Sequence, residues 1–294
     1  MKALSPILAG IDFSSSSPQV LAHAAKLAAA TGSRLVAAHV IPSGTIKEWE
    51  DTMALEADTA GRLQEMTRRL EDLVNECCGG VPAIAEVRIG SPHKVLAEIA
   101  RDHGADLLVL GAHDVSKRRL GSVASRCTRS VPVDVLLLRD WQSRFFHQIA
   151  ACVDFSEGSA AVVERAITLA EAHHASLEII HVIFPPGRDP WGRVMDQPMD
   201  ADVSYEARVR ERARQRMDHF LKPIAGRLAG IDSKVLILEA ESPAAAITAH
   251  VDVTGIDLTV TGSGEGSWLA DLVLGSNTER LLHDSTSSVL LVRS

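Results

Sequence analysis

The 294-residue sequence predicts an α/β fold with two doubly wound, five-stranded parallel sheets, one after the other along the chain. Short apolar segments of strand length alternate with longer amphipathic segments of helix length, which is typical of parallel sheets covered by helices. The same short motifs also occur twice in the same order. Aromatic residues make up only 4% of the chain, which disfavours aromatic-rich sandwiches and base-stacking surfaces.

Composition argues against several classes of partner. The 30 Lys and Arg residues against 38 Asp and Glu residues give a net charge of −8, the wrong overall field for binding nucleic acid or an anionic membrane. No apolar run is long enough to span a membrane, and the first apolar stretch is too short for a signal peptide, so we expect a cytoplasmic protein. The four cysteines show no zinc spacing, so we expect reduced thiols and no metal site.

An internal repeat covers almost the whole chain. The segment 11–14 (Ile-Asp-Phe-Ser) recurs as 153–156 (Val-Asp-Phe-Ser), and 39–41 (His-Val-Ile) recurs as 181–183, both with an offset of 142 residues (154 − 12 and 181 − 39). Later matches have offsets of 151 and 154 residues. They are Ser91-Pro92 with Ser242-Pro243, Gly111 with Gly262, Gly121-Ser122 with Gly275-Ser276, and Val135–Arg139 with Val289–Arg293. Six matches in one order indicate a tandem duplication.

The two copies are expected to form two domains, residues 1–140 and 145–294. A short polar bridge near Trp141 separates them, and nothing there resembles a long flexible linker. We therefore expect the two copies to pack together.

The first copy alternates strands with helices. Pro6–Ile11 is an apolar run bounded by turn residues, which predicts a buried strand. Ser14–Ser17 and Pro18 supply capping and first-turn residues for a helix that ends at Gly32. The other elements expected in this copy are strands at Leu35–Ile41, Ala83–Ile89, Leu107–Leu110 and Val133–Leu138, a long helix from Glu48 to Cys78, a helix from Ser91-Pro92 to Gly104, and a helix around Ser122–Arg129.

The second copy repeats this alternation. Its strands are expected near Ile149–Val153, Leu177–Ile183, Lys234–Leu238, Leu258–Thr261 and Ser288–Val292. Strict alternation implies right-handed crossovers and a parallel sheet whose ligands bind beyond the carboxyl ends of its strands. Three loops of each copy lie there: one after strand one (Asp12 or Asp154), one after strand two (Val40 or Val182), and one after strand four (Gly111 or Gly262).

The motifs in these loops resemble those of the universal stress proteins. The resemblance is carried by Asp-Phe-Ser after strand one, His-Val after strand two, Gly-Ser-Pro before the third helix, and a glycine-rich loop that reaches Gly-Ser. It implies the strand order 3-2-1-4-5 of the adenine-nucleotide alpha-hydrolase-like fold, and often a bound ATP or related adenine nucleotide. It also implies dimerisation through strand five, which a tandem chain would satisfy as an internal pseudo-dimer, alone or within a homodimer.

The glycine-rich loop of the second copy keeps the length that the resemblance requires. Nucleotide-binding members carry Gly-x2-Gly-x9-Gly-Ser/Thr, and Gly262 and Gly275 are 13 residues apart (275 − 262), as in that pattern. Glu265, however, occupies the second glycine position. A carboxylate about 6 Å from a phosphate costs roughly 2–3 kcal/mol, on the order of 100-fold in affinity, unless a cation such as Mg²⁺ bridges the two.

The first copy departs further from the pattern. Gly111 and Gly121 are only 10 residues apart (121 − 111), and Asp114 occupies the second glycine position. We therefore expect no ATP in the first copy.

The expected nucleotide site lies in the second copy. The resemblance implies that Asp154 contacts the adenosine end, while glycine backbone and Ser276 would hold phosphates, because glycines and a helix N-terminus let N–H groups approach phosphate oxygens. The expected site residues are Val153, Asp154, Phe155, Val182, Thr261, Gly262, Gly264, Glu265, Gly275, Ser276, Asn277 and Thr278. Their weaker equivalents in the first copy are Asp12, Val40, Gly111, Gly121 and Ser122.

Several of the singled-out residues also have an interpretation without a ligand. Asp12 and Asp154 are common types of turn or capping residue, and His39 and His181 lie late in strands, where a structural imidazole is expected. The alternating arginines of 208–216 indicate a solvated, salt-bridged helix surface.

No catalytic motif is present: GxSxG, Walker A, HExxH and an EF-hand loop are all missing, so no catalytic residue is assigned. The leading hypothesis is a regulatory ATP-binding protein of the stress response. One alternative is an interaction scaffold that binds no nucleotide, which the acidic second-glycine positions favour. The other is a slow ATPase that relies on positioning and a metal alone.

Overall fold

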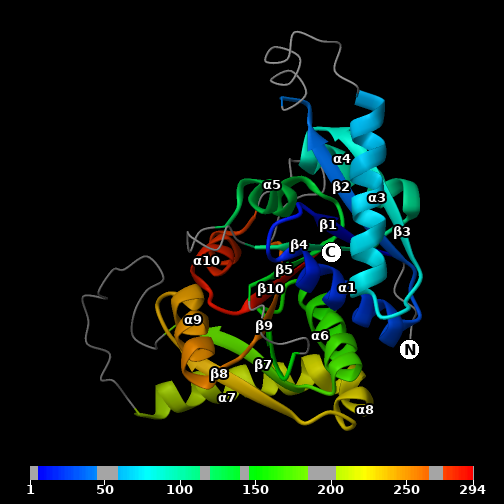
Figure 1. The fold of residues 1–294 in the computed structure, drawn as a ribbon. Helices are drawn as coiled ribbons and strands as arrows, with labels where there is room; N and C mark the ends of the chain where they lie inside the picture. Colours follow the sequence, from blue (N-terminus) through cyan, green and yellow to red (C-terminus); the bar gives the residue numbers. More distant parts are fainter. Residues whose placement is uncertain are drawn as a thin grey trace. The chain divides into compact units, whose positions relative to one another are not determined.

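The computed structural model describes residues 6–44, 59–112, 120–139, 146–184, 203–264 and 274–293 (Figure 1). By their contacts these residues form two compact units. The first unit holds the described residues up to 139 together with 288–293, and the second holds residues 146–264 and 274–287. No helix within the described ranges is both long and apolar enough to cross a bilayer.

The first unit contains a parallel sheet in the order β3-β2-β1-β4-β5. Its elements are β1 (Ile7–Ile11), α1 (Ser17–Thr31), β2 (Leu35–Pro42), α3 (Thr59–Cys77), β3 (Ala83–Gly90), α4 (Pro92–His103), β4 (Leu107–Gly111), α5 (Ser122–Ser130) and β5 (Asp134–Leu138). The strands agree with the sequence prediction to within a residue or two. The predicted long helix is described only over α3, because residues 45–58 lie outside the described residues.

The last strand of the chain, β10 (Ser288–Val292), belongs to the first unit. It pairs antiparallel with β5, with Leu290 opposite Leu136. Both ends of the pairing are fastened: the Arg139 amide donates to Ser288 Oγ at 3.1 Å, and the Arg293 amide donates to Asp134 Oδ1 at 2.8 Å. The outer side of β5 is therefore covered by a strand from the far end of the sequence.

The second unit repeats the same topology. Its elements are β6 (Gln148–Cys152), α6 (Ser159–His173), β7 (Ser176–Ile183), α7 (Val203–Leu221), a 3₁₀ turn η1 (Lys222–Ile224), α8 (Ala225–Leu228), β8 (Ser233–Glu239), α9 (Pro243–Thr254), β9 (Leu258–Gly262) and α10 (Ser276–Asp284). For the second copy of the repeat, as distinct from the second unit, the strand order β8-β7-β6-β9-β10 is the order 3-2-1-4-5 of the first copy. The predicted fold class is confirmed. The bridge at 140–145 lies outside the described residues, and the division into domains 1–140 and 145–294 stays a prediction.

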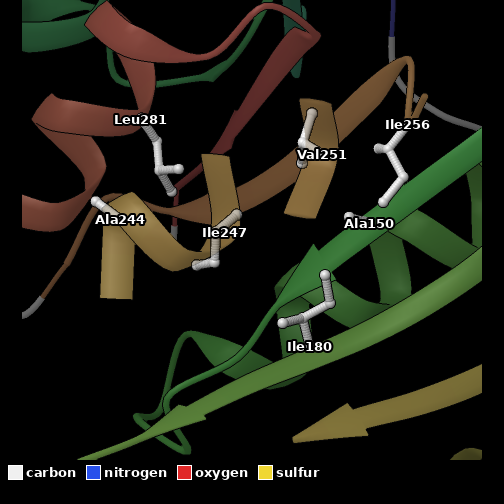
Figure 2. Close-up of a cluster of buried hydrophobic side chains, with 7 residues drawn as sticks. All are labelled: Ala150, Ile180, Ala244, Ile247, Val251, Ile256 and Leu281. Atoms are coloured by element: carbon white, nitrogen blue, oxygen red, sulfur yellow. The ribbon is translucent and has the colours of Figure 1, made fainter. Parts of the chain in front are cut away.

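A core of buried aliphatic side chains fixes α10 within the second unit. Figure 2 shows side chains from α9, α10, β6 and β7 converging with the residue that precedes β9. Burying one large aliphatic side chain stabilises a fold by about 1.5–3 kcal/mol. The cluster consists of Ala150, Ile180, Ala244, Ile247, Val251, Ile256 and Leu281. Because Leu281 lies on α10, this core holds the helix in place beside the strand ends.

Candidate functional site

In the second unit, the loops after strands one and four meet at one edge of the sheet. Strands β6 and β9 are parallel neighbours, with Ala151 opposite Val260. The carboxyl ends of neighbouring parallel strands lie side by side, so the Asp154 loop and the Gly262 loop share the edge where α/β sheets bind ligands.

Asp154 closes a tight turn at the end of β6. Its Oδ1 accepts hydrogen bonds from the Ser156 amide at 2.9 Å, from Ser156 Oγ at 2.5 Å and from Ser159 Oγ at 2.8 Å. Partial burial opposes ionisation, but these hydrogen bonds outweigh it and lower the pKa of Asp154. The side chain is therefore a carboxylate at neutral pH. It is solvent-exposed, and all three of these bonds go to one of its two oxygens.

Asp12 makes the corresponding turn in the first unit. Its Oδ1 accepts from the Ser14 amide at 2.9 Å and from Ser17 Oγ at 2.9 Å. Burial again opposes ionisation, and the hydrogen bonds from Ser14 and Ser17 again lower the pKa of Asp12. Both aspartates thus make the contacts that are expected of turn residues even when no ligand is bound. These contacts fix where each carboxylate lies.

The residue after each aspartate adopts an unusual backbone conformation. Phe155 has a φ of 63°, in the left-handed region that bulky residues rarely occupy. Its ring packs on the His181 ring with centroids 4.3 Å apart, and the Arg216 guanidinium lies 4.4 Å from the Phe155 centroid. The edge of Phe220 completes the contact at 5.6 Å. This Arg–Phe–His stack therefore links three elements: helix α7, the loop that follows β6, and strand β7.

The first unit contains the same stack. Phe13 has a φ of 60°, and its ring centroid lies 4.6 Å from the centroid of the His39 ring. The Arg69 guanidinium lies 4.3 Å from the Phe13 centroid. His39 Nδ1 lies 2.7 Å from the Ile11 carbonyl oxygen, and His181 Nδ1 lies 2.8 Å from the Val153 carbonyl oxygen. Both imidazoles thus have the structural bond expected of histidines late in a strand.

Sequence reasoning missed both arginines. The solvated interpretation of 208–216 fits Arg210, which pairs with Glu239, but it overlooks the packing of Arg216 on Phe155. A signal was present: Arg69-Leu70 and Arg216-Met217 stand 147 residues apart (216 − 69), an offset between those of the earlier and later repeat matches.

The glycine-rich loop of the second unit has a narrow neck. The Gly275 amide donates to the Ser263 carbonyl at 3.0 Å, which closes the loop at its base. Gly264 has a φ of +90°, and a Cβ there would stand 2.9 Å from the Gly275 nitrogen. Both features require glycine at 264. Thr278 Oγ1 also donates to the Gly262 carbonyl at 2.8 Å and ties the first turn of α10 to the end of β9.

The first unit has an equivalent neck around a shorter loop. The Gly121 amide donates to the Ala112 carbonyl at 3.0 Å, so Gly121 corresponds to Gly275 and Ala112 to Ser263. Eight residues lie between the first pair and eleven between the second (121 − 112 − 1 and 275 − 263 − 1). The position of Thr278 is held in this unit by Ala124, which has no hydroxyl.

The structure brings most of the predicted residues of the second copy to one edge. Val153, directly after β6, and Thr261, in β9, are buried, and Val182 packs against the aliphatic core. Ser276 and Asn277 are exposed at the start of α10. The first N–H groups of a helix have no intrahelical acceptor, so the start of α10 offers donors to an anion. Glu265 lies outside the described residues, as do Asp114 and the tips of both glycine-rich loops.

Metal ligands and nucleophilic thiols are the other kinds of functional group to consider within the described ranges. No group of three or more His, Cys, Asp or Glu side chains there could hold a metal. His173 is buried, and its Nδ1 accepts from the Phe146 amide at 3.3 Å, which is a structural contact. The cysteines are free thiols, and burial raises the pKa of Cys127 and of Cys152 to about 12, so these two are poor nucleophiles.

The fold and this edge define a class of protein: a tandem of doubly wound α/β repeats, each with an aspartate loop after its first strand and a glycine-rich loop after its fourth. The family model described as the universal stress protein family matches residues 4–139 and again residues 145–293. The chain therefore belongs to the universal stress protein family and contains two of its domains in tandem.

Individual proteins resemble this chain in sequence or in fold. The chain is 28% identical to universal stress protein A homolog 1 of Coxiella burnetii over 153 residues, half of this chain and 96% of the relative. A functionally unknown protein from Pseudomonas aeruginosa has a TM-score of 0.71 at 19% identity, covering 99% of this chain and 93% of that one. A universal stress protein from Archaeoglobus fulgidus has a TM-score of 0.64 at 20% identity, covering 98% of both chains. One solved universal stress protein is described as a complex with cAMP.

Proposed function

We propose that this universal stress protein is a regulatory adenine-nucleotide-binding protein whose site lies in the second copy. One observation carries the proposal: the exposed start of α10, next to the Gly264–Gly275 neck, lies at the same strand edge as the Asp154 carboxylate. The two ends of a nucleotide, one anionic and one bearing N–H and O–H groups, match these two features.

The phosphate end would lie at the start of α10. The Ser276 and Asn277 amides are the first donors of the helix, and Gly275 gives a phosphate access to the backbone because it has no side chain. The residue that begins the helix, Gly275, supplies no side-chain cap to these donors. Glycine at 264 lets the two ends of the loop approach each other closely, because a Cβ there would stand 2.9 Å from the Gly275 nitrogen.

The adenosine end would lie at the loop after β6. The carboxylate of Asp154 has a low pKa, so it accepts hydrogen bonds and does not donate them. Such a group selects the hydroxyl groups of a ribose or the amino group of a base. Bound nucleotide would then stabilise the folded copy or change its contacts with a protein partner.

The decisive measurement is a thermal shift and a calorimetric titration with ATP, ADP and AMP, each with and without Mg²⁺. A nucleotide at 100 times its Kd should stabilise the protein by about 2.7 kcal/mol. Gly275→Val should abolish this stabilisation by blocking backbone approach, whereas the matched variant Gly121→Val in the first copy should leave it unchanged.

Each other outcome identifies an alternative. No stabilisation by any nucleotide would overturn the proposal and favour the interaction scaffold. Phosphate release that disappears in Gly275→Val would favour the slow ATPase. Binding that is unaffected by EDTA would exclude a Mg²⁺ bridge to Glu265.

A further inference from the structure

We propose that Arg216 is a positioning residue for this site: its guanidinium, stacked on Phe155, holds the loop that carries Asp154 in its binding conformation before any ligand arrives. The inference rests on the proposed function and adds to it a residue on α7, outside the two loops that would contact the nucleotide.

The loop after β6 needs an external restraint. A phenylalanine at a φ of 63° is strained, because its Cβ crowds the backbone in the left-handed region. Such a conformation persists only when surrounding contacts hold it. The ring contacts of Phe155 come from other elements: His181 from β7, and Arg216 and Phe220 from α7. Arg216 is the charged member, and it lies over the face of the ring, where a cation is attracted.

This restraint acts on Asp154 from both sides. On one side, the His181 ring is hydrogen-bonded through Nδ1 to the Val153 carbonyl at 2.8 Å, which fixes the end of the strand. On the other side, Phe155 sets the direction in which the chain turns toward Ser156. The Ser156 amide then donates to Asp154 Oδ1 at 2.9 Å and orients the carboxylate. Loss of the stack would free Phe155 and with it this hydrogen bond.

The recurrence of the stack argues against coincidence. Arg69, Phe13 and His39 form it in the first unit with the same left-handed backbone, although the glycine-rich loops of the two copies differ in length. The stack therefore accompanies the aspartate loop and not the phosphate end. Each copy also serves as a control for the other.

The main experiment is hydrogen exchange of single amides in variants of the full-length chain. A cation–π contact at an exposed site corresponds to about two- to fivefold in an equilibrium. Arg216→Ala should speed exchange of the Ser156 amide by this factor and leave the Ser14 amide of the first copy unchanged. Arg69→Ala should do the reverse. Arg214→Ala removes the same charge from an exposed position of the same helix and should change neither amide.

Nucleotide affinity provides the functional readout. Arg216→Ala should weaken ATP binding by about two- to fivefold, whereas Arg69→Ala and Arg214→Ala should not weaken it. Arg216→Lys keeps the charge but loses the planar stack, so its affinity should lie between that of Arg216→Ala and that of the unmodified protein.

The titration of His181, followed by NMR, tests the contact itself. Burial lowers the pKa of His181, the Val153 carbonyl raises it, the nearby Arg216 charge lowers it, and the Asp154 carboxylate raises it. Arg216→Ala should therefore raise the pKa of His181 and leave that of His39 unchanged. A change confined to global stability would not produce this selective shift.

Two failures are distinguishable. If the unmodified protein binds no adenine nucleotide, the proposed function is wrong. If it binds nucleotide but Arg216→Ala changes neither Ser156 exchange nor affinity, the positioning role of Arg216 is wrong.

Discussion

The two copies share one half of the candidate site and differ in the other. Both hold an aspartate by the same serine contacts, followed by a left-handed phenylalanine stacked between a histidine and an arginine. Only the second copy has the longer glycine-rich loop and the Thr278 bond that ties α10 to β9. After duplication, the loop after strand one was thus kept twice, while the loop after strand four diverged. The two loops of the candidate site can therefore differ independently on one fold.

The largest expected effect is a loss of nucleotide affinity when the neck of the glycine-rich loop is altered in the second copy but not in the first. Gly264→Ala would place a methyl group 2.9 Å from the Gly275 nitrogen, on a backbone that disfavours any side chain. We expect a loss of about 2 kcal/mol or more in nucleotide binding, roughly 30-fold in affinity, measured by calorimetric titration. Gly121→Ala is the control, since its methyl would lie 3.9 Å from the Ala112 oxygen and should be tolerated. Equal losses in both variants would contradict the assignment of the site to the second copy.

The next effect tests whether the shared aspartate has the same role in each copy. Asp154→Ala should weaken nucleotide binding by about 1.5 kcal/mol, roughly tenfold, because a carboxylate acceptor is lost. Asp12→Ala removes the same kind of turn contacts, so both variants should lose about 1 kcal/mol of unfolding free energy. Chemical denaturation measures the second quantity and titration the first. An affinity that falls in Asp12→Ala as well would mean that the first copy also binds nucleotide.

A smaller effect is expected from converting one copy toward the other. Thr278→Ala installs the residue type that the first copy has at this position, Ala124, and removes the hydrogen bond to the Gly262 carbonyl. We expect the free energy of unfolding to fall by about 1 kcal/mol, and the affinity to fall by less than in Asp154→Ala. Thr278→Ser, which keeps the hydroxyl, should restore most of both losses. Failure of serine to do so would indicate packing of the methyl group as the cause.

The smallest effect concerns pH and should appear in both copies alike. Burial lowers the pKa of His39 and of His181 below the ordinary value near 6.5, so the folded protein favours the neutral imidazoles. Their stabilising contribution is complete above pH 6.5 and is lost as pH falls through the folded-state pKa values. Denaturation between pH 7.5 and 5 should show this loss, and the double variant His39→Gln/His181→Gln should flatten the profile. An equal slope in the double variant would assign the loss to other groups.

The sequence was sufficient to predict the fold and the duplication, and it indicated that the Asp154 loop and the Gly262 loop share one strand edge. Strand segments are apolar runs, and the loop motifs recur at regular offsets, so both signals are local. The three-residue difference between the glycine-rich loops was also readable, since it is a matter of counting. The stack of Arg216 on Phe155 was not, because it depends on how α7 is rotated about its axis and on a positive φ in a non-glycine residue. The alternation of the arginines along the sequence does not show which one of them lies over the Phe155 ring.

The position of β10 limits how this chain can be divided. The outermost strand of the first unit is β10, which comes from the final residues of the sequence. A fragment that stops at the bridge would therefore leave the outer edge of β5 exposed and unpaired. Exposed strand margins of this kind recruit other chains. A fragment that contains only the earlier repeat is therefore expected to self-associate.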